Sequence, residues 1–249
     1  MSFFGITARN EGQKRLGEAC KSRKPIVIGT GRSGTGKSLI AQAVGFDVVF
    51  QERRWHKSGK FVYTRLQVDV GKSVGFLPGD LAGKSEPYFR PFFDNLSLMD
   101  NGDYMKGYIT KGNIVLDSIQ TVRGGTYHNS YLIVDEAQNL DNATMTAIGT
   151  RLAEGSKLIL LGNFSQIDIP SLRNPDNNGF YKLLKGLYES GRHDMFTHVH
   201  LTECERGPIA DLVESIMVPE AEINSLFVQL EERGLLTQSG GDYLNGYDA

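Results

Sequence analysis

Short, continuous apolar runs recur along the chain and constrain its fold more than any other feature. They lie at 26–29, 61–64, 113–116, 131–134, 157–161 and 198–202. Because apolar and polar residues do not alternate within them, these runs are typical of strands buried on both faces of a parallel sheet. Helical patterns separate them, at 10–22, 37–45, 84–99, 141–153 and 207–217. Strands alternating with helices predict an α/β sheet domain that binds its ligands at the carboxyl ends of the strands.

The chain has 249 residues, and these elements fit one domain, which we place at residues 1–218. A C-terminal helix and a loose tail are expected at 219–249. In that helix one apolar face is formed by Ile223, Leu226, Phe227 and Leu230. We expect this face to pack on the chain's own core, although packing on a neighbouring copy is the alternative. Residues 50–60 are expected to form a basic turn or hairpin.

The charge balance limits the possible partners. Lys and Arg number 27 and Asp and Glu 29, which gives a net charge of −2. Such a chain has no global field to attract nucleic acid, so any polyanion site must be local. No apolar stretch approaches the roughly 18 residues of a membrane span, and the N-terminus does not resemble a secretory signal. With only two cysteines, we expect a cytoplasmic protein without a membrane partner.

The first apolar run leads directly into a glycine-rich loop of the form G-x-x-x-x-G-K-S/T. Its glycines permit turns with positive φ that aim backbone N–H groups at a triphosphate. Lys37 brings a compact charge to the β and γ phosphates, and the Ser38 hydroxyl coordinates Mg²⁺. The loop therefore predicts binding of ATP with Mg²⁺. The residues expected to bind the nucleotide here are Gly31, Ser33, Gly34, Thr35, Gly36, Lys37 and Ser38.

Two adjacent acids follow the run at 131–134. Asp135 is expected to hold Mg²⁺, together with Ser38, through a metal-bound water. Glu136 is expected to orient and deprotonate the attacking water. The alternative is an acidic helix N-cap after a strand. A base beside the metal favours hydrolysis over phosphate transfer to a small molecule.

Polar residues also follow the next strand. Asn163 and Gln166 are expected to contact the γ-phosphate or the attacking water and to report hydrolysis to the rest of the protein. An ordinary polar turn is the alternative interpretation.

These motifs and the segments around them resemble the PhoH-like ATPases, a branch of the P-loop proteins related to the first helicase superfamily. The resemblance extends over 7–19, 62–65, 71–96, 118–139 and 150–170, and includes Arg206 before a helix. The stretch at 71–96, with its Gly-Phe-Leu-Pro-Gly-Asp core, is especially typical. The resemblance implies a three-layer RecA-like P-loop NTPase core with a mostly parallel sheet.

The resemblance also implies roles for single residues. Gln13 resembles a glutamine that reads adenine, since an amide donates and accepts at once; an exposed helical glutamine is the alternative. Arg206 resembles an arginine finger, which stabilises charge on the transferring phosphoryl group, or is a surface arginine. Thr64, Arg65 and Arg123 are candidate nucleic-acid contacts or, equally, structural ion-pair partners.

Three positions depart from the family pattern. Asn163 stands where the family usually has Asp, which removes a charge and puts coupling to hydrolysis in doubt. Leu66 replaces a proline, and Gly125 replaces an arginine. The last change weakens the turn before the acidic strand as a nucleic-acid contact.

Related helicases close ATP between two cores, whereas this chain contains one. A neighbouring subunit can supply the second wall, and head-to-tail contacts of that kind generate rings or filaments. The resemblance implies a homo-oligomer, a hexameric ring, and single-stranded RNA more than DNA. The basic segment 53–57 places Trp55 amid positive charge, a pattern that suits base stacking, or it is a solvated hairpin tip.

Two functions therefore remain open. One is Mg²⁺-dependent ATP hydrolysis coupled to RNA remodelling or helicase activity. The other is an ATP-binding oligomeric scaffold or regulator with slow hydrolysis and no unwinding, which Asn163 favours.

Overall fold

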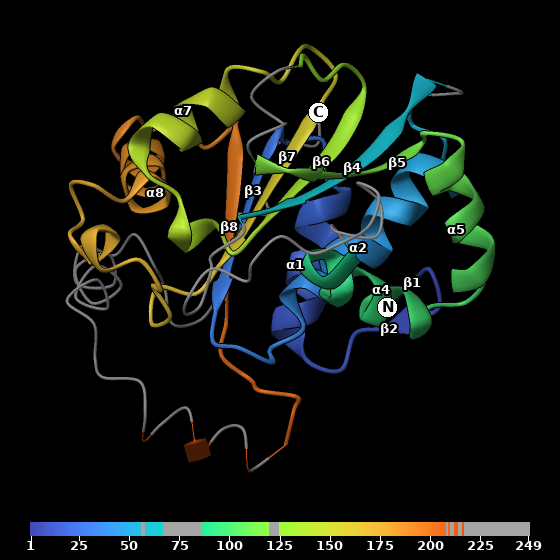
Figure 1. The fold of residues 1–249 in the computed structure, drawn as a ribbon, viewed down its shortest axis with the longest axis horizontal. Coiled ribbons are helices and arrows are strands. Elements are labelled where there is room, and N and C mark those ends of the chain that lie inside the picture. Colours follow the sequence, from blue (N-terminus) through green and yellow to red (C-terminus); the bar gives the residue numbers. More distant parts are fainter. Residues whose placement is uncertain are drawn as a thin grey trace, which may run out of the picture.

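The computed structural model describes residues 1–55, 58–66, 86–119 and 125–207, together with residues 209, 212, 213 and 216. These residues form a six-stranded sheet with helices on both faces (Figure 1). None of the helices in this part of the chain is long and apolar enough to cross a membrane.

The sheet confirms all six predicted strands. They are β3 (Ile26–Gly31), β4 (Lys60–Arg65), β5 (Ile114–Ser118), β6 (Ser130–Asp135), β7 (Lys157–Gly162) and β8 (Phe196–Leu201). Their order is β5-β4-β6-β7-β3-β8, and every neighbouring pair is parallel. All carboxyl ends therefore meet at one edge of the sheet. At that edge β7 separates β3, which leads into the glycine-rich loop, from the acidic strand β6.

The helices form two layers (Figure 1). One layer contains α1 (Glu11–Lys21), α2 (Lys37–Phe46), α4 (Arg90–Ser97) and α5 (Gly102–Thr110), with the hairpin of β1 (Ser2–Phe3) and β2 (Ile6–Thr7) beside it. The other contains α7 (Asn142–Gly149) and α8 (Gly179–Glu189). The predicted helix at 84–99 is a 3₁₀ turn, Glu86–Phe89, followed by α4. The hairpin, α5 and α8 were not predicted.

Each face of the sheet has its own apolar core. Alternate residues of a strand point to opposite faces, so Val27 of β3 packs in the cluster under α1 and α2, whereas Ile28 packs in the cluster under α7 and α8. Every residue of β6 and of β7 is buried. Burial on both faces explains why the apolar runs in the sequence are continuous.

The described residues of the basic segment after α2 include a turn at Arg54 and Trp55, as predicted. Residues Asp47–Gln51 continue α2 as a short π-helix. The guanidinium of Arg54 then donates to the carbonyls of Lys21 and Ser22 at the end of α1. Trp55 is half-buried and packs against the core beneath α1 and α2. Because this segment precedes β4, it lies at the amino edge of the sheet. Stacking of Trp55 on nucleic-acid bases stays a prediction.

Several predictions concern residues outside the described part of the chain. Arg123, His56, Lys57 and the segment 219–249 all lie outside the described residues, as does most of the sequence at 71–96. The expected helix at 207–217 is described at four positions after residue 207, and each of these is helical.

Candidate active site

The glycine-rich loop connects β3 to α2. Gly34 and Gly36 have φ angles of +76° and +84°, in the region that favours glycine. A Cβ on Gly36 would lie 2.7 Å from Nε2 of Gln13. The Lys37 Nζ donates to the carbonyls of Gly31 and Arg32, at 2.7 Å each, so the loop folds around its own lysine. The positive φ angles explain why glycine stands at positions 34 and 36, and the two carbonyl contacts fix the side chain of Lys37.

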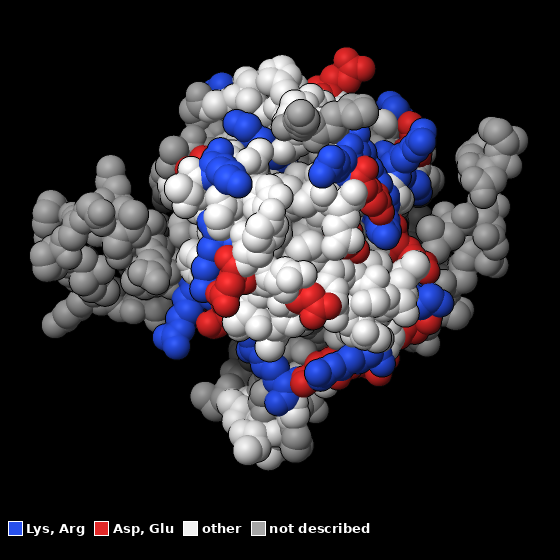
Figure 2. Space-filling view, turned by 90° about the vertical axis from the view of Figure 1, so that its right-hand side faces the viewer, with Lys and Arg blue, Asp and Glu red and all other residues white. Residues whose placement is uncertain are grey.

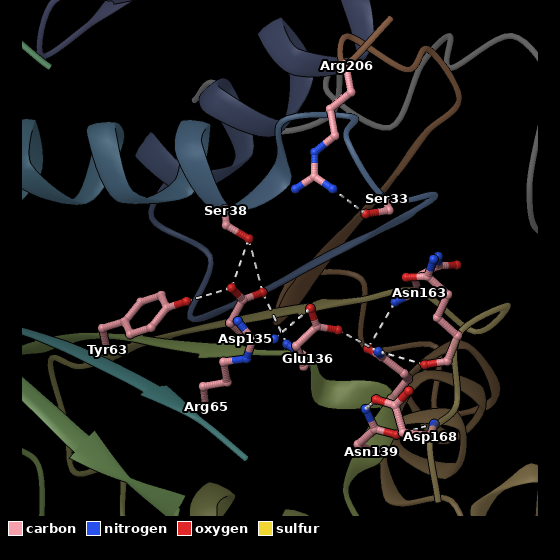
Figure 3. Close-up of polar contacts among 12 residues, drawn as sticks. Ser33, Ser38, Tyr63, Arg65, Asp135, Glu136, Asn139, Asn163, Asp168 and Arg206 are labelled. Carbon is pink, nitrogen blue, oxygen red and sulfur yellow. Dashed lines mark hydrogen bonds and ion pairs between the residues drawn. The ribbon is translucent and has the colours of Figure 1, made fainter. Parts of the chain in front are cut away.

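The two predicted metal ligands lie together (Figure 3). The Ser38 Oγ, in the first turn of α2, donates to both carboxylate oxygens of Asp135, at 3.0 Å each. Tyr63 of β4 donates its hydroxyl to Asp135 Oδ2 at 2.6 Å. Burial, followed by the Asp135 charge, raises the pKa of Tyr63 well above its ordinary value, so the phenol keeps its proton and donates. A hydroxyl beside a carboxylate is the hard oxygen donor set that suits Mg²⁺.

Glu136 follows Asp135 in an unusual backbone conformation, with φ of 56°. Its Oε2 accepts a hydrogen bond of 2.6 Å from Gln138 Nε2. Its Oε1 lies 3.5 Å from Arg65 Nη2 (Figure 3). Burial, and next the Asp135 charge, raise the pKa of Glu136, while Gln138, Arg65 and Lys37 act in the opposite direction. Both carboxylate oxygens therefore have partners within the chain.

Gln138 links this glutamate to the end of β7 and was missed in the sequence. Its side chain is fully buried. Its Oε1 accepts from the Asn163 backbone N–H at 3.0 Å, and its Nε2 also donates to the Gln166 carbonyl at 3.0 Å. The Asn163 side chain accepts from the backbone N–H of Ser165. The only signal for Gln138 was its place three residues after Asp135.

Gln13 contacts the loop from α1. Its Oε1 accepts from the Arg9 backbone N–H at 2.9 Å, and its Nε2 donates to the Thr35 carbonyl at 3.2 Å. Both ends of the amide thus hold the chain itself in this conformation. Its reading of adenine stays a prediction.

Arg206 lies over the loop of its own chain. Its Nη1 donates to Ser33 Oγ at 3.1 Å (Figure 3), and the backbone N–H of Glu205 donates to the Gly34 carbonyl at 2.9 Å. The Glu205 carboxylate also accepts from Asn10 Nδ2, in the N-cap of α1. The segment around Arg206 is therefore attached to the loop by backbone and side-chain contacts.

A cavity of about 810 Å³ opens above these residues. Its lining includes every predicted nucleotide-binding or catalytic residue except Gly31 and Thr35. Thr35 is buried and donates its hydroxyl to the Arg32 carbonyl. The volume suits a nucleotide-sized ligand, since small-molecule sites commonly measure about 300–1,000 Å³.

The neighbouring residues of β4 differ in access. Thr64 is fully buried, and its hydroxyl has no hydrogen-bond partner among the described residues. The side chain of Arg65 is 31% exposed. The Thr64 side chain therefore cannot contact a nucleic acid at the surface, whereas the Arg65 side chain is accessible.

A glycine-rich loop between a strand and a helix, with an acidic strand two places away in a parallel sheet, defines a P-loop protein with a RecA-like fold. A family model described as PhoH-like protein matches residues 5–217, and the chain belongs to this family.

Among curated relatives, a PhoH-like protein of Bacillus subtilis (strain 168) is 39% identical over 165 residues, which cover 66% of this chain and 50% of the relative. Protein PhoH2 of the same organism is 34% identical over 222 residues, covering 86% of this chain and 48% of the relative. The chain therefore spans about half the length of these two relatives.

Two solved structures give weaker matches. The HK97 bacteriophage large terminase has a TM-score of 0.47 at 12% identity, covering 92% of this chain and 48% of its own. The Pif1 helicase from Candida albicans has a TM-score of 0.41 at 14% identity, covering 88% of this chain and 47% of its own.

Proposed function

We propose that this PhoH-like protein hydrolyses ATP with Mg²⁺. The observation that carries the proposal is the pair of 3.0 Å contacts from the Ser38 hydroxyl to Asp135, in the cavity that Lys37 and Glu136 also line. When bound there, Mg²⁺ neutralises charge on the phosphate oxygens. Lys37 binds the β and γ phosphates, and Glu136 takes a proton from the attacking water.

Two further residues complete the proposed chemistry. Arg206 stabilises charge on the transferring phosphoryl group, and its hydrogen bond to Ser33 supports action within its own chain. The end of β7 presents Asn163 and Gln166 to the same cavity. Their link to Glu136 through Gln138 supports a role in reporting the state of the phosphate.

The test is ATP hydrolysis by Glu136→Gln. We expect this variant to bind ATP with Mg²⁺ as tightly as the wild type but to turn over about 10²- to 10⁴-fold more slowly, because an amide does not accept the proton. Binding is measured by calorimetry and turnover by phosphate release. Glu189→Gln, an exposed residue at the end of α8, is the matched control. A fully active Glu136→Gln variant would exclude this residue as the base.

We also propose that the protein acts as a homo-oligomer, a hexameric ring, that remodels or unwinds single-stranded RNA. The partly exposed Arg65 beside Glu136 supports a polyanion contact at the carboxyl end of β4. In Figure 2, Lys and Arg side chains are interleaved with Asp and Glu over the face seen there. A small number of local cations, rather than a broad basic field, would then bind the RNA.

A mass measurement on the sample used for the ATPase assays, with and without nucleotide, tests the hexameric ring. ATPase and strand-displacement assays with single-stranded RNA test the coupling. Stimulation and unwinding are expected. A monomeric mass under all conditions would contradict the ring, and unstimulated ATPase without unwinding would contradict the RNA coupling.

A second candidate is an ATP-binding oligomeric scaffold with slow hydrolysis. Asn163 favours it, because an amide that caps its own turn at Ser165 brings no charge to the phosphate. Slow turnover that RNA does not accelerate is the result that would select this function.

A further inference from the structure

We propose that Arg65 is a positioning residue that restrains Glu136, and that an RNA phosphate releases this restraint by pairing with Arg65. The proposal rests on the proposed function, since it explains how RNA binding would accelerate ATP hydrolysis. Its physical basis is the ion pair of 3.5 Å between Arg65 Nη2 and Glu136 Oε1 (Figure 3).

Strand β4 contacts both active-site carboxylates. Tyr63 and Arg65 are two residues apart and so point to the same face of the sheet. The parallel register pairs Arg65 with Asp135 of β6. Tyr63 therefore reaches Asp135, at 2.6 Å, while Arg65 reaches Glu136. A ligand that moves the end of β4 acts directly on the base.

The two partners of Glu136 differ in how easily they move. Gln138 is fully buried and held by two further hydrogen bonds to the end of β7. Arg65 has an exposed fraction of 31%, and an ion pair at that exposure is weak. Arg65 is thus the partner that a competing anion can remove without disturbing the core.

A phosphodiester is well suited to that competition. The planar guanidinium binds two phosphate oxygens at once, in a geometry that matches better than a single contact at 3.5 Å. Glu136 then keeps its Gln138 contact through Oε2, while Oε1 is free to turn to the water. Hydrolysis becomes faster only when RNA is present.

The decisive experiment measures ATP hydrolysis without RNA by Arg65→Ala and by Arg65→Gln, which keeps more of the side chain but not its charge. We expect kcat to rise about two- to fivefold over the wild type, the range that loss of a weak ion pair supports. The KM for ATP should stay unchanged, and oligouridine should accelerate neither variant further. Arg65→Lys keeps the charge, so it should retain a low basal rate and some stimulation.

Arg192→Ala is the matched control, because Arg192 also forms an exposed ion pair, with Asp194, outside the cavity. Thermal unfolding checks that each variant is folded. A basal kcat at or below the wild-type value in folded Arg65→Gln overturns the restraint. If Arg65→Gln is faster but RNA does not stimulate the wild type, RNA is excluded as the releasing ligand. If neither protein hydrolyses ATP, the restraint and the proposed function both fail.

Discussion

Asp135 accepts hydrogen bonds from two elements, from Ser38 at the start of α2 and from Tyr63 in the middle of β4. The serine hydroxyl is a metal ligand in the proposed site, whereas the phenol only orients the carboxylate. Groups of this second kind commonly change metal affinity about 10- to 100-fold when they are removed. Tyr63 is therefore the residue whose loss separates metal affinity from catalysis.

We predict that Tyr63→Phe raises the Mg²⁺ concentration for half-maximal ATP hydrolysis about tenfold. The ring still packs against Phe92, at 5.4 Å between centroids, so the fold should persist. A Mg²⁺ titration of the ATPase rate measures the effect, with the exposed Tyr104→Phe as the control. An unchanged Mg²⁺ requirement would show that the phenol does not orient the carboxylate.

At this scale, the residues whose function depends on local spacing could be predicted from the sequence. Lys37 and Ser38 are adjacent at the start of α2, and Asp135 and Glu136 are adjacent at the end of β6, so all four line the cavity. Tyr63 and Gln138 were missed because their contacts depend on the register of β4 against β6 and on the fold of the β7 end. The spacing of residues along the chain encodes neither this strand register nor the fold of the β7 end.

At the scale of elements, β8 and α8 support the strand that leads into the loop. Thr30 Oγ1, near the end of β3, lies 2.7 Å from His198 Nε2 and 2.9 Å from His200 Nδ1. The Tyr188 hydroxyl of α8 lies 2.9 Å from His198 Nδ1. Burial, and then the neighbouring His200, lower the pKa of His198 to about 3. The native protein therefore holds this ring neutral.

This network predicts a pH dependence of stability. An unfolded histidine titrates near a pKa of about 6.5, so between pH 6.5 and 3 the unfolded chain binds a proton that native His198 does not. The free energy of unfolding should therefore fall as the pH falls through this window, by at most about 1.4 kcal/mol per pH unit from this residue. His198→Gln should reduce that slope, measured by urea denaturation at several pH values.

The exposed His128→Gln is the control for this prediction and should keep the wild-type slope. Equal slopes for His198→Gln and the wild type would mean that His198 titrates alike in both states.

The elements themselves were largely predictable, because buried parallel strands leave continuous apolar runs. The contacts that Arg54 and Trp55 make within their own fold were not predictable, for a physical reason. A cluster of cations and an aromatic ring looks the same in the sequence whether it binds a ligand or packs on its own fold. The Arg54 partners, the carbonyls of Lys21 and Ser22, are over 30 residues away in the chain. The placement of β7 between β3 and β6 was equally invisible, since periodicity carries no information on strand order.

For the whole molecule, the position of Arg206 decides how subunits cooperate. Its contact with Ser33 of the same chain predicts that the arginine serves its own site. When Arg206→Ala and Glu136→Gln subunits are mixed, every site then has one defect, and no activity should return at any ratio. Phosphate release is the measurement, and mixing each variant with wild type checks that subunits exchange. Recovery of activity would show that the arginine acts on a neighbouring site.

The phosphate loop is touched from both ends of the described domain, by Gln13 in the first helix and by residues 204–206 after the last strand. A nucleotide bound in this loop would stabilise the contacts that both ends of the domain make with the loop. Fraying of either end would open the cavity, and filling the cavity would hold both ends down. Affinity for the nucleotide and the local stability of these two distant segments are then thermodynamically linked, and a mutation that loosens either end would weaken binding without touching the ligand.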